Sequence, residues 1–193
     1  MNGGSLSDVI RDPESQYSED FCRYVLYMVA MGLNEMHQKN ILHRDIKSDN
    51  ILCSSDGQIK IADLGFSVFL TQQEAFRRTR LGTAQWVSPE IIQQKPYSKE
   101  VDVWAFGIFA YELATGRPPF PSNRGTDSLF QTVLSSAAPP IPDKWSPRFS
   151  AFIDRCLDKN ASTRATVAGL LGHEFLQGAA ECKQAWINDF AQW

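Results

Sequence analysis

Residues 43–50 read His43-Arg44-Asp45-Ile46-Lys47-Ser48-Asp49-Asn50, and Asp63-Leu64-Gly65 follows a short distance later. A carboxylate, a lysine, an asparagine and a second carboxylate in this order suit phosphate chemistry on Mg²⁺. Asp45 can accept a hydroxyl proton, and Lys47 can neutralise charge on a phosphoryl group. Asn50 and Asp63 offer the hard oxygen ligands that Mg²⁺ prefers. We expect these four side chains to converge around the terminal phosphate of a nucleotide and its metal.

The chain around this stretch predicts a mainly helical domain. Long helices are predicted over residues 17–39 and 98–115, where apolar residues recur at helical spacing, and shorter helices over 126–135, 149–157, 167–171 and 179–190. Two short strands, 51–53 and 58–61, flank an Asp-Gly pair and predict a hairpin beside the catalytic stretch. Residues 138–147 are rich in proline and predicted to be extended, and 63–90 to be an irregular loop.

Composition limits the possible functions. The 193 residues are 43% hydrophobic, enough for one well-buried domain, and the net charge of −3 without a long basic block argues against a nucleic-acid partner. No apolar run is long enough to span a membrane, and the N-terminus lacks the pattern of a signal peptide. The four cysteines lie far apart and predict reduced, mostly buried thiols, and hence a cytoplasmic or nuclear protein.

The motif at 43–50 and the Asp-Leu-Gly after it resemble the eukaryotic protein kinases, whose catalytic loop H-R-D-x-x-x-x-N is followed by D-F-G. The sequences G-G-S-L at 3–6 and G-T-A-Q-W-V-S-P-E at 82–90 are similar to the STE group of Ser/Thr kinases, and D-V-W-A-F-G at 102–107 looks like the family's central-helix motif. Lys47 is typical of the Ser/Thr type. The resemblance covers residues 1–176 and implies transfer of the γ-phosphoryl group of ATP, with Mg²⁺, to Ser or Thr of protein substrates.

The resemblance also implies an organisation of the chain. Residues 1–6 correspond to the hinge, 43–50 to the catalytic loop and 63–90 to the activation segment, and 177–193 form a helical extension. The small lobe, with its glycine-rich loop and ATP-positioning lysine, has no counterpart in the sequence. The chain is thus expected to be the C-terminal lobe of a kinase. Met1 is either an internal methionine at the hinge or the start of a true short protein.

Roles at the nucleotide site follow from the same resemblance. Asp45, Lys47, Asn50 and Asp63 are the expected catalytic residues, with Asn50 and Asp63 on the metal and Asn50 also holding the Asp45 backbone. The residues expected to bind ATP are Met1, Asn2, Lys47, Leu52 and Asp63. Leu52 would form the floor under the adenine ring, although a core strand residue is an equally simple interpretation.

Regulatory and structural roles are expected for other residues. Thr79 matches the activation-loop threonine, with Arg44 as the partner of its phosphate, and the alternative is an exposed threonine that is never modified. Thr83 is expected to bond the Asp45 and Lys47 pair and shape the substrate pocket. The expected structural residues are His43 beneath Leu64, Asp102 holding the catalytic loop, and Glu90 paired with Arg164. Leu64 replaces the usual Phe of D-F-G, and Ser88 the Ala of A-P-E.

Two hypotheses about function follow. The first is a protein serine/threonine kinase, activated by an upstream kinase or a small GTPase through regions outside this sequence. The second is a catalytically silent lobe that acts by binding a substrate or regulator of another kinase. The intact motifs favour the first hypothesis, whereas the missing small lobe predicts that this polypeptide has little activity by itself.

Overall fold

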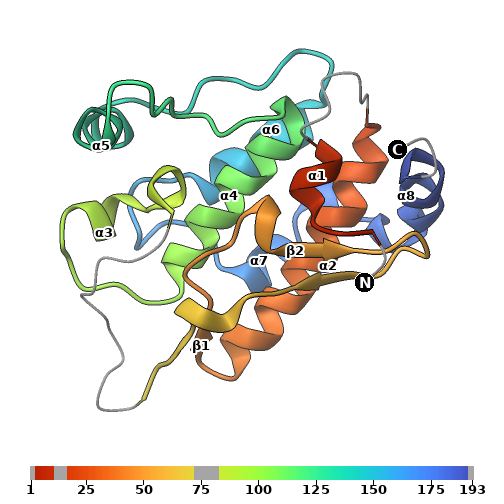
Figure 1. Cartoon of the computed structure of the whole chain (residues 1–193), viewed down its shortest axis with the longest axis horizontal. Coiled ribbons are helices and arrows are strands. Elements are labelled where there is room, and N and C mark those ends of the chain that lie inside the picture. Colours follow the sequence, from red (N-terminus) through yellow and green to blue (C-terminus); the bar gives the residue numbers. More distant parts are fainter. Residues whose placement is uncertain (1–2, 11–16, 72–82, 191–193) are drawn as a thin grey trace.

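The computed structural model describes residues 3–10, 17–71 and 83–190. Its helices are α1 (Leu6–Ile10), α2 (Glu19–Gln38), α3 (Pro89–Ile92), α4 (Glu100–Thr115), α5 (Thr126–Ser135), α6 (Pro147–Cys156), α7 (Val167–Leu171) and α8 (Lys183–Phe190). Short 3₁₀ turns cover Ser48–Asn50, Leu64–Phe66, Ala84–Trp86, Glu174–Leu176 and Ala179–Cys182. The prediction of a mainly helical domain is confirmed (Figure 1).

Helix α2 begins and is buried as its sequence predicts. Ser18 is the N-cap and its hydroxyl accepts a hydrogen bond from the Phe21 N–H, while Glu19 and Asp20 complement the positive end of the helix dipole. Most of its apolar stripe is fully buried, namely Phe21, Val25, Val29 and Leu33. The helix contacts α7, α8 and β3 (Ile59–Ile61). This helix therefore joins the catalytic half of the chain to its C-terminal segment.

Helix α4 is buried on almost every side and packs against α6, crossing the middle of the molecule in Figure 1. It ends where predicted, because Gly116 takes a left-handed conformation with φ of 75° and its N–H bonds the carbonyl of Glu112 at 2.7 Å. Gly107 makes the close contact with α6 possible, since a Cβ there would lie 2.5 Å from the Cβ of Cys156.

The strands form two small antiparallel sheets in the described part of the chain. Strands β2 (Ile51–Cys53) and β3 pair with Ile51 opposite Ile61, which confirms the predicted hairpin. Strands β1 (Ile41–Leu42) and β4 (Val68–Phe69) pair as well, with Ile41 opposite Phe69. The prediction that 63–90 is entirely irregular was therefore wrong, since the segment contains β4, two 3₁₀ turns and the start of α3.

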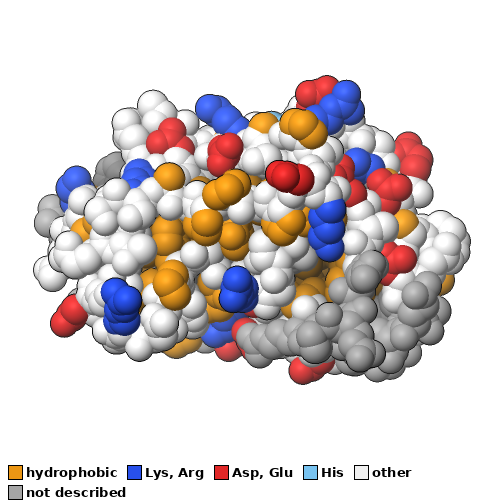
Figure 2. Space-filling model, turned by 90° about the horizontal axis from the view of Figure 1, so that it is seen from above, with side chains coloured by type: hydrophobic (Ala, Val, Ile, Leu, Met, Phe, Trp, Pro, Cys, Tyr) orange, Lys and Arg blue, Asp and Glu red, His pale blue; other side chains and the backbone are white. Residues whose placement is uncertain are grey.

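The remaining predictions were close. Helices α5 and α7 have the predicted bounds, whereas the segment predicted as one helix over 179–190 is a 3₁₀ turn followed by α8. Residues 137–142 are irregular, as their prolines favour, but the extended segment predicted over 138–147 ends earlier, because 143–145 form a turn and Pro147 begins α6. Figure 2 shows hydrophobic side chains exposed in the middle of the face formed by the loops that join α4, α5 and α6. No helix in the described ranges is long and apolar enough to cross a membrane.

Candidate active site

The catalytic loop is fastened to α4 by the buried carboxylate of Asp102. Its Oδ2 accepts the backbone N–H of His43 at 2.9 Å, and its Oδ1 accepts the backbone N–H of Arg44 at 2.7 Å. The Nε2 atom of His37 lies 2.9 Å from Oδ2. Arg44 has a positive φ of 68°, a backbone state that non-glycine residues seldom adopt unless their surroundings hold them there. Asp102 thus holds the catalytic loop as expected, and His37, for which no role was predicted from the sequence, belongs to the same cluster.

The ring of His43 is fully buried and links the two catalytic loops. Its Nδ1 accepts the backbone N–H of Asp45 at 3.3 Å, so the proton is on Nε2, which donates to the carbonyl of Ala62 at 3.0 Å. The N–H of Ala62 in turn donates to the carbonyl of Asn50 at 2.8 Å. These bonds place Asp63, the next residue, beside the end of the catalytic loop.

The carboxylate of Asp45 is buried and receives four hydrogen bonds. Its Oδ1 accepts the hydroxyl of Thr83 at 2.8 Å and the Thr83 N–H at 3.2 Å, and its Oδ2 accepts the amide of Asn50 at 2.8 Å. The Nζ of Lys47 lies 3.0 Å from Oδ2 and donates to the Thr83 hydroxyl at 2.7 Å. Burial acts to raise the pKa of Asp45, but the bonds from Lys47, Thr83 and Asn50 outweigh it and hold the pKa below the usual value. The carboxylate is therefore ionised at neutral pH and held in a fixed orientation.

Asn50 and Asp63 provide the oxygen ligands expected for a metal. The Asn50 amide nitrogen also donates to the Asp45 carbonyl at 2.8 Å, so its Oδ1 is the atom directed away from Asp45. Asp63 is exposed, has a left-handed backbone with φ of 60°, and accepts the N–H of Gly65 at 3.1 Å through Oδ1. One carboxylate and one amide oxygen fit Mg²⁺, which keeps waters and substrate phosphates as its other ligands. Within the described residues, no cluster of three or more His, Cys, Asp or Glu side chains suits a tightly held metal.

Leu64 differs from its expected position. It is 61% exposed, and the nearby Phe66 and Phe69 are 39% and 63% exposed. The 3₁₀ turn that follows the left-handed Asp63 directs this segment outward. The expectation that Leu64 fills an apolar slot above His43 was wrong for this chain.

The end of the activation segment is fixed by a buried ion pair. Glu90 in α3 and Arg164 form two parallel hydrogen bonds of 2.6 and 3.0 Å. Arg164 also donates to the carbonyls of Glu100 at 2.7 Å and Asp158 at 2.8 Å, so three segments meet at one guanidinium. The pairing expected from sequence is present, and the small Ser88 is buried beside it.

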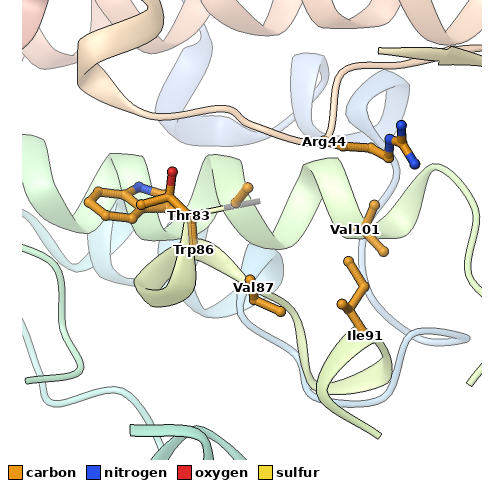
Figure 3. Close-up of a pocket in the computed structure, with 7 residues that line it drawn as sticks. Arg44, Thr83, Trp86, Val87, Ile91 and Val101 are labelled. Carbon is orange, nitrogen blue, oxygen red and sulfur yellow. The ribbon is translucent and has the colours of Figure 1, made fainter. Parts of the chain in front are cut away.

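A small cavity lies between the catalytic loop and the activation segment (Figure 3). Arg44 approaches it from the catalytic loop, and Thr83, Trp86, Val87 and Ile91 from the opposite side. The guanidinium of Arg44 donates to the carbonyl of Phe66 at 2.6 Å and to the hydroxyl of Tyr97 at 3.3 Å. Thr79, its expected phosphate-bearing partner, lies outside the described residues.

Residues 3–5, part of the segment 1–6 that was expected to be the hinge, run beside β2. The N–H of Gly3 donates to the carbonyl of Cys53 at 3.2 Å, the N–H of Cys53 donates to that of Gly4 at 3.1 Å, and Ser5 forms a bridge with Leu52. The side chain of Leu52 is half-buried. Met1 and Asn2 lie outside the described residues, so their expected contact with the nucleotide stays a prediction.

Besides the His37 contact, the sequence did not reveal a second supporting contact, between Glu112 and Ser48. Glu112 is buried in α4, and its Oε1 accepts the hydroxyl of Ser48 in the catalytic loop at 2.8 Å. The signal was available, because Glu112 is a charged residue inside a helix that is otherwise apolar nearly all round, and a buried charge needs a partner.

The comparisons agree with this geometry. The family model for the protein kinase domain matches residues 1–176. The chain is similar to the serine/threonine-protein kinase SKM1 of Saccharomyces cerevisiae (38% identical, covering 97% of this chain and 30% of the relative). It is also similar to the serine/threonine-protein kinase pakA of Dictyostelium discoideum, with 40% identity over 93% of this chain and 15% of the relative. The serine/threonine-protein kinase CLA4 of Eremothecium gossypii is 35% identical over 100% of this chain and 25% of the relative. The chain thus spans less than a third of the length of these relatives.

Proposed function

The chain belongs to the protein kinase family, and from this premise we propose that it is the large-lobe part of a serine/threonine kinase of the STE20 and PAK type. Its reaction would be transfer of the γ-phosphoryl group of ATP to a Ser or Thr hydroxyl of a protein substrate. The observation that carries the proposal is the ionised Asp45 carboxylate, held in place by Lys47, Asn50 and Thr83.

The residues of the chain supply positioning and charge. Asp45 would orient the substrate hydroxyl and accept its proton, because its oxygens are fixed in place and its lowered pKa keeps the carboxylate ionised at neutral pH. Lys47 would neutralise charge on the transferred group, and its position is already set by two bonds. Kinases achieve most of their rate by such positioning and charge stabilisation.

Members of the family generally use ATP and Mg²⁺, and the donor set here fits them. Asn50 and Asp63 are the residues that would hold the metal, while Leu52 and residues 1–5 would lie along the adenine. A bound Mg²⁺ would supply positive charge that offsets the negative charge of the ATP phosphates.

Regulation is proposed through Thr79 and Arg44. A phosphate on Thr79 would add about −1.5 to −2 charge, and the guanidinium fork of Arg44 suits phosphate oxygens. We place the protein in the cytoplasm or nucleus, with an upstream kinase or small GTPase as activator through regions outside this sequence.

Phosphoryl transfer from labelled ATP to a mixture of Ser/Thr peptides tests the proposal. We expect little turnover by residues 1–193 alone, because the ATP-covering lobe is not in the sequence. We expect clear turnover by a longer product whose reading frame continues upstream of Met1, and Asp45→Asn in that product should lower it by about 10²–10⁴-fold. Turnover that Asp45→Asn leaves unchanged would refute the assignment, and strong turnover by 1–193 would refute the expected inactivity.

A silent, binding lobe is the second candidate, and one observation favours it. The exposed side chains of Leu64, Phe66 and Phe69 lie beside the catalytic loop and offer an apolar surface to another protein. An in-frame stop codon close upstream of Met1 would favour this candidate. A small-lobe sequence with a glycine-rich loop and a strand lysine would exclude it in favour of the active kinase.

A further inference from the structure

The C-terminal segment 177–190 is built into the core although it lies beyond the 1–176 match to the family model. Trp186 of α8 is fully buried, and Ala179 in the preceding turn is 2% exposed. Helix α8 packs against α2 and lies above the turn of the β2–β3 hairpin, at the right of Figure 1. The segment therefore contributes to the core although it lies outside the part of the chain that the family model covers.

Two aromatic side chains hold the hairpin turn from two different helices. The indole N–H of Trp186 donates to the carbonyl of Ser54 at 3.2 Å, and the hydroxyl of Tyr24 in α2 donates to the carbonyl of Gly57 at 2.8 Å. Gly57 has a φ of 83°, and a Cβ there would lie 2.6 Å from the Cε of Lys183. The turn is thus clamped between α2 and α8, and a side chain at Gly57 would meet Lys183 and the ring of Trp186.

Helix α8 is itself fixed to the start of α2. The ring of Trp186 stacks on Phe21 with centroids 4.9 Å apart, and Phe21 stacks on Tyr17 at 4.3 Å. The carboxylate of Asp189 accepts both the N–H and the hydroxyl of Ser18, at 3.0 and 2.7 Å. These contacts hold α8 in one position on α2, so that Trp186 is a fixed donor for the carbonyl of Ser54.

The clamped turn is directly continuous with the proposed nucleotide site. Ser54 directly follows Leu52 and Cys53, the last two residues of β2. The N–H of Cys53 donates to the carbonyl of Gly4, and the carbonyl of Cys53 accepts the N–H of Gly3. The other strand of the hairpin leads to Asp63, the proposed metal ligand. One short hairpin thus connects Leu52, the proposed adenine floor, with the contact to residues 3–4 and with Asp63, the proposed metal ligand. Trp186 holds the turn at the other end of this hairpin.

We propose that Trp186 is a positioning residue for the nucleotide site: through its hydrogen bond to Ser54 it fixes the β2–β3 hairpin, and with it the edge that receives the adenine. The inference rests on the proposed kinase function. It assigns to α8 a part in nucleotide affinity without any contact between α8 and the nucleotide.

Trp186→Phe tests the inference, because phenylalanine keeps an aromatic ring against Phe21 but cannot donate to Ser54. The net free energy of one typical hydrogen bond sets the expected size of the effect. We expect amide exchange at Cys53 and Gly3 to become about three to ten times faster, and the Kd of Mg·ADP to rise about three to tenfold. Asn188→Ala, at an exposed position of the same helix, should change neither. Phe152→Leu should lower the unfolding midpoint without changing the Kd, which separates positioning from a general loss of stability.

The outcomes are distinct. Unchanged exchange at Cys53 and Gly3 in Trp186→Phe, or an unchanged Kd, would overturn the inference. If the unmodified protein binds no Mg·ADP while the exchange rates still rise, the proposed nucleotide site fails and the mechanical link between α8 and the hairpin stands. Should Trp186→Phe not fold, the indole N–H resonance of the unmodified protein decides: bound Mg·ADP must slow its exchange, because coupling between two sites is reciprocal.

Discussion

Asp102→Asn should destabilise this protein far more than the loss of one charge suggests. The carboxylate is fully buried and accepts three bonds, from the N–H groups of His43 and Arg44 and from the ring of His37. An asparagine has one acceptor oxygen, so whichever way its amide turns, one backbone N–H faces an N–H₂ group. An unsatisfied buried donor costs about 1–3 kcal/mol, and bonds to a charged acceptor contribute about 1.5–3 kcal/mol each. We expect a total loss of about 3–5 kcal/mol, out of the roughly 5–15 kcal/mol that stabilise a typical domain.

Urea unfolding and hydrogen exchange measure this loss. With a denaturant slope near 2 kcal/mol/M, the unfolding midpoint should fall by about 1.5–2.5 M urea. Exchange of the His43 and Arg44 amides should accelerate more than exchange in the centre of α2. Asp154→Asn, which removes an exposed carboxylate from α6, is the matched control and should shift the midpoint little. A variant of Asp102 within 0.5 kcal/mol of the unmodified protein, with both amides still protected, would refute the reasoning.

Three further predictions concern stability. Arg164→Ala should cost about 3–5 kcal/mol in urea unfolding, because it leaves the buried Glu90 carboxylate without its partner; a loss below 1 kcal/mol would contradict this. Gly107→Ala should cost about 1–3 kcal/mol, although alanine favours helices, because its Cβ would meet Cys156 at 2.5 Å; a stabilised variant would show that α4 and α6 separate easily. The pKa of Asp45 is lower in the folded state than its usual value, so its contribution to stability is complete well above pH 4 and is lost as the pH falls through the folded pKa. Carboxyl NMR titration should give a pKa below the usual value, and a raised one would contradict the hydrogen-bond pattern.

Long elements were predictable from the sequence because their signals are local. Helix α4 shows an uninterrupted apolar run ended by Gly116, and α2 shows an N-cap followed by a regular stripe. By contrast, β1 and β4 are two residues each and pair across a long stretch of chain, with Leu42 opposite Val68. Such a pairing depends on the tertiary position of both segments, and two residues carry no periodicity to reveal it.

The contacts within the site were largely predictable from the sequence, whereas the exposure of individual side chains such as Leu64 was not. The bond of Thr83 to Asp45 and the bond of Asn50 to the Asp45 backbone were expected from the resemblance to the protein kinases. The exposure of Leu64 could not be read from its apolar side chain, because burial depends on what lies opposite. His37 was missed because a lone histidine in a helix gives no sign of its partner, here a carboxylate supplied by a distant helix.

The buried carboxylates of α4 explain how a mainly apolar helix can organise a polar site. Asp102 holds His43 and Arg44 at one end of the catalytic loop, and Glu112 holds Ser48 near the other. Ten residues of helix separate these two carboxylates by about 15 Å. Helix α4 therefore fixes the distance between the two points at which it holds the loop. Replacing buried charges by well-packed apolar side chains is often neutral or stabilising for a fold, so stability alone gives little reason to bury two carboxylates in this helix. Their positions make sense if the geometry of residues 43–50 is what they maintain, since apolar side chains at these places cannot accept hydrogen bonds from the loop.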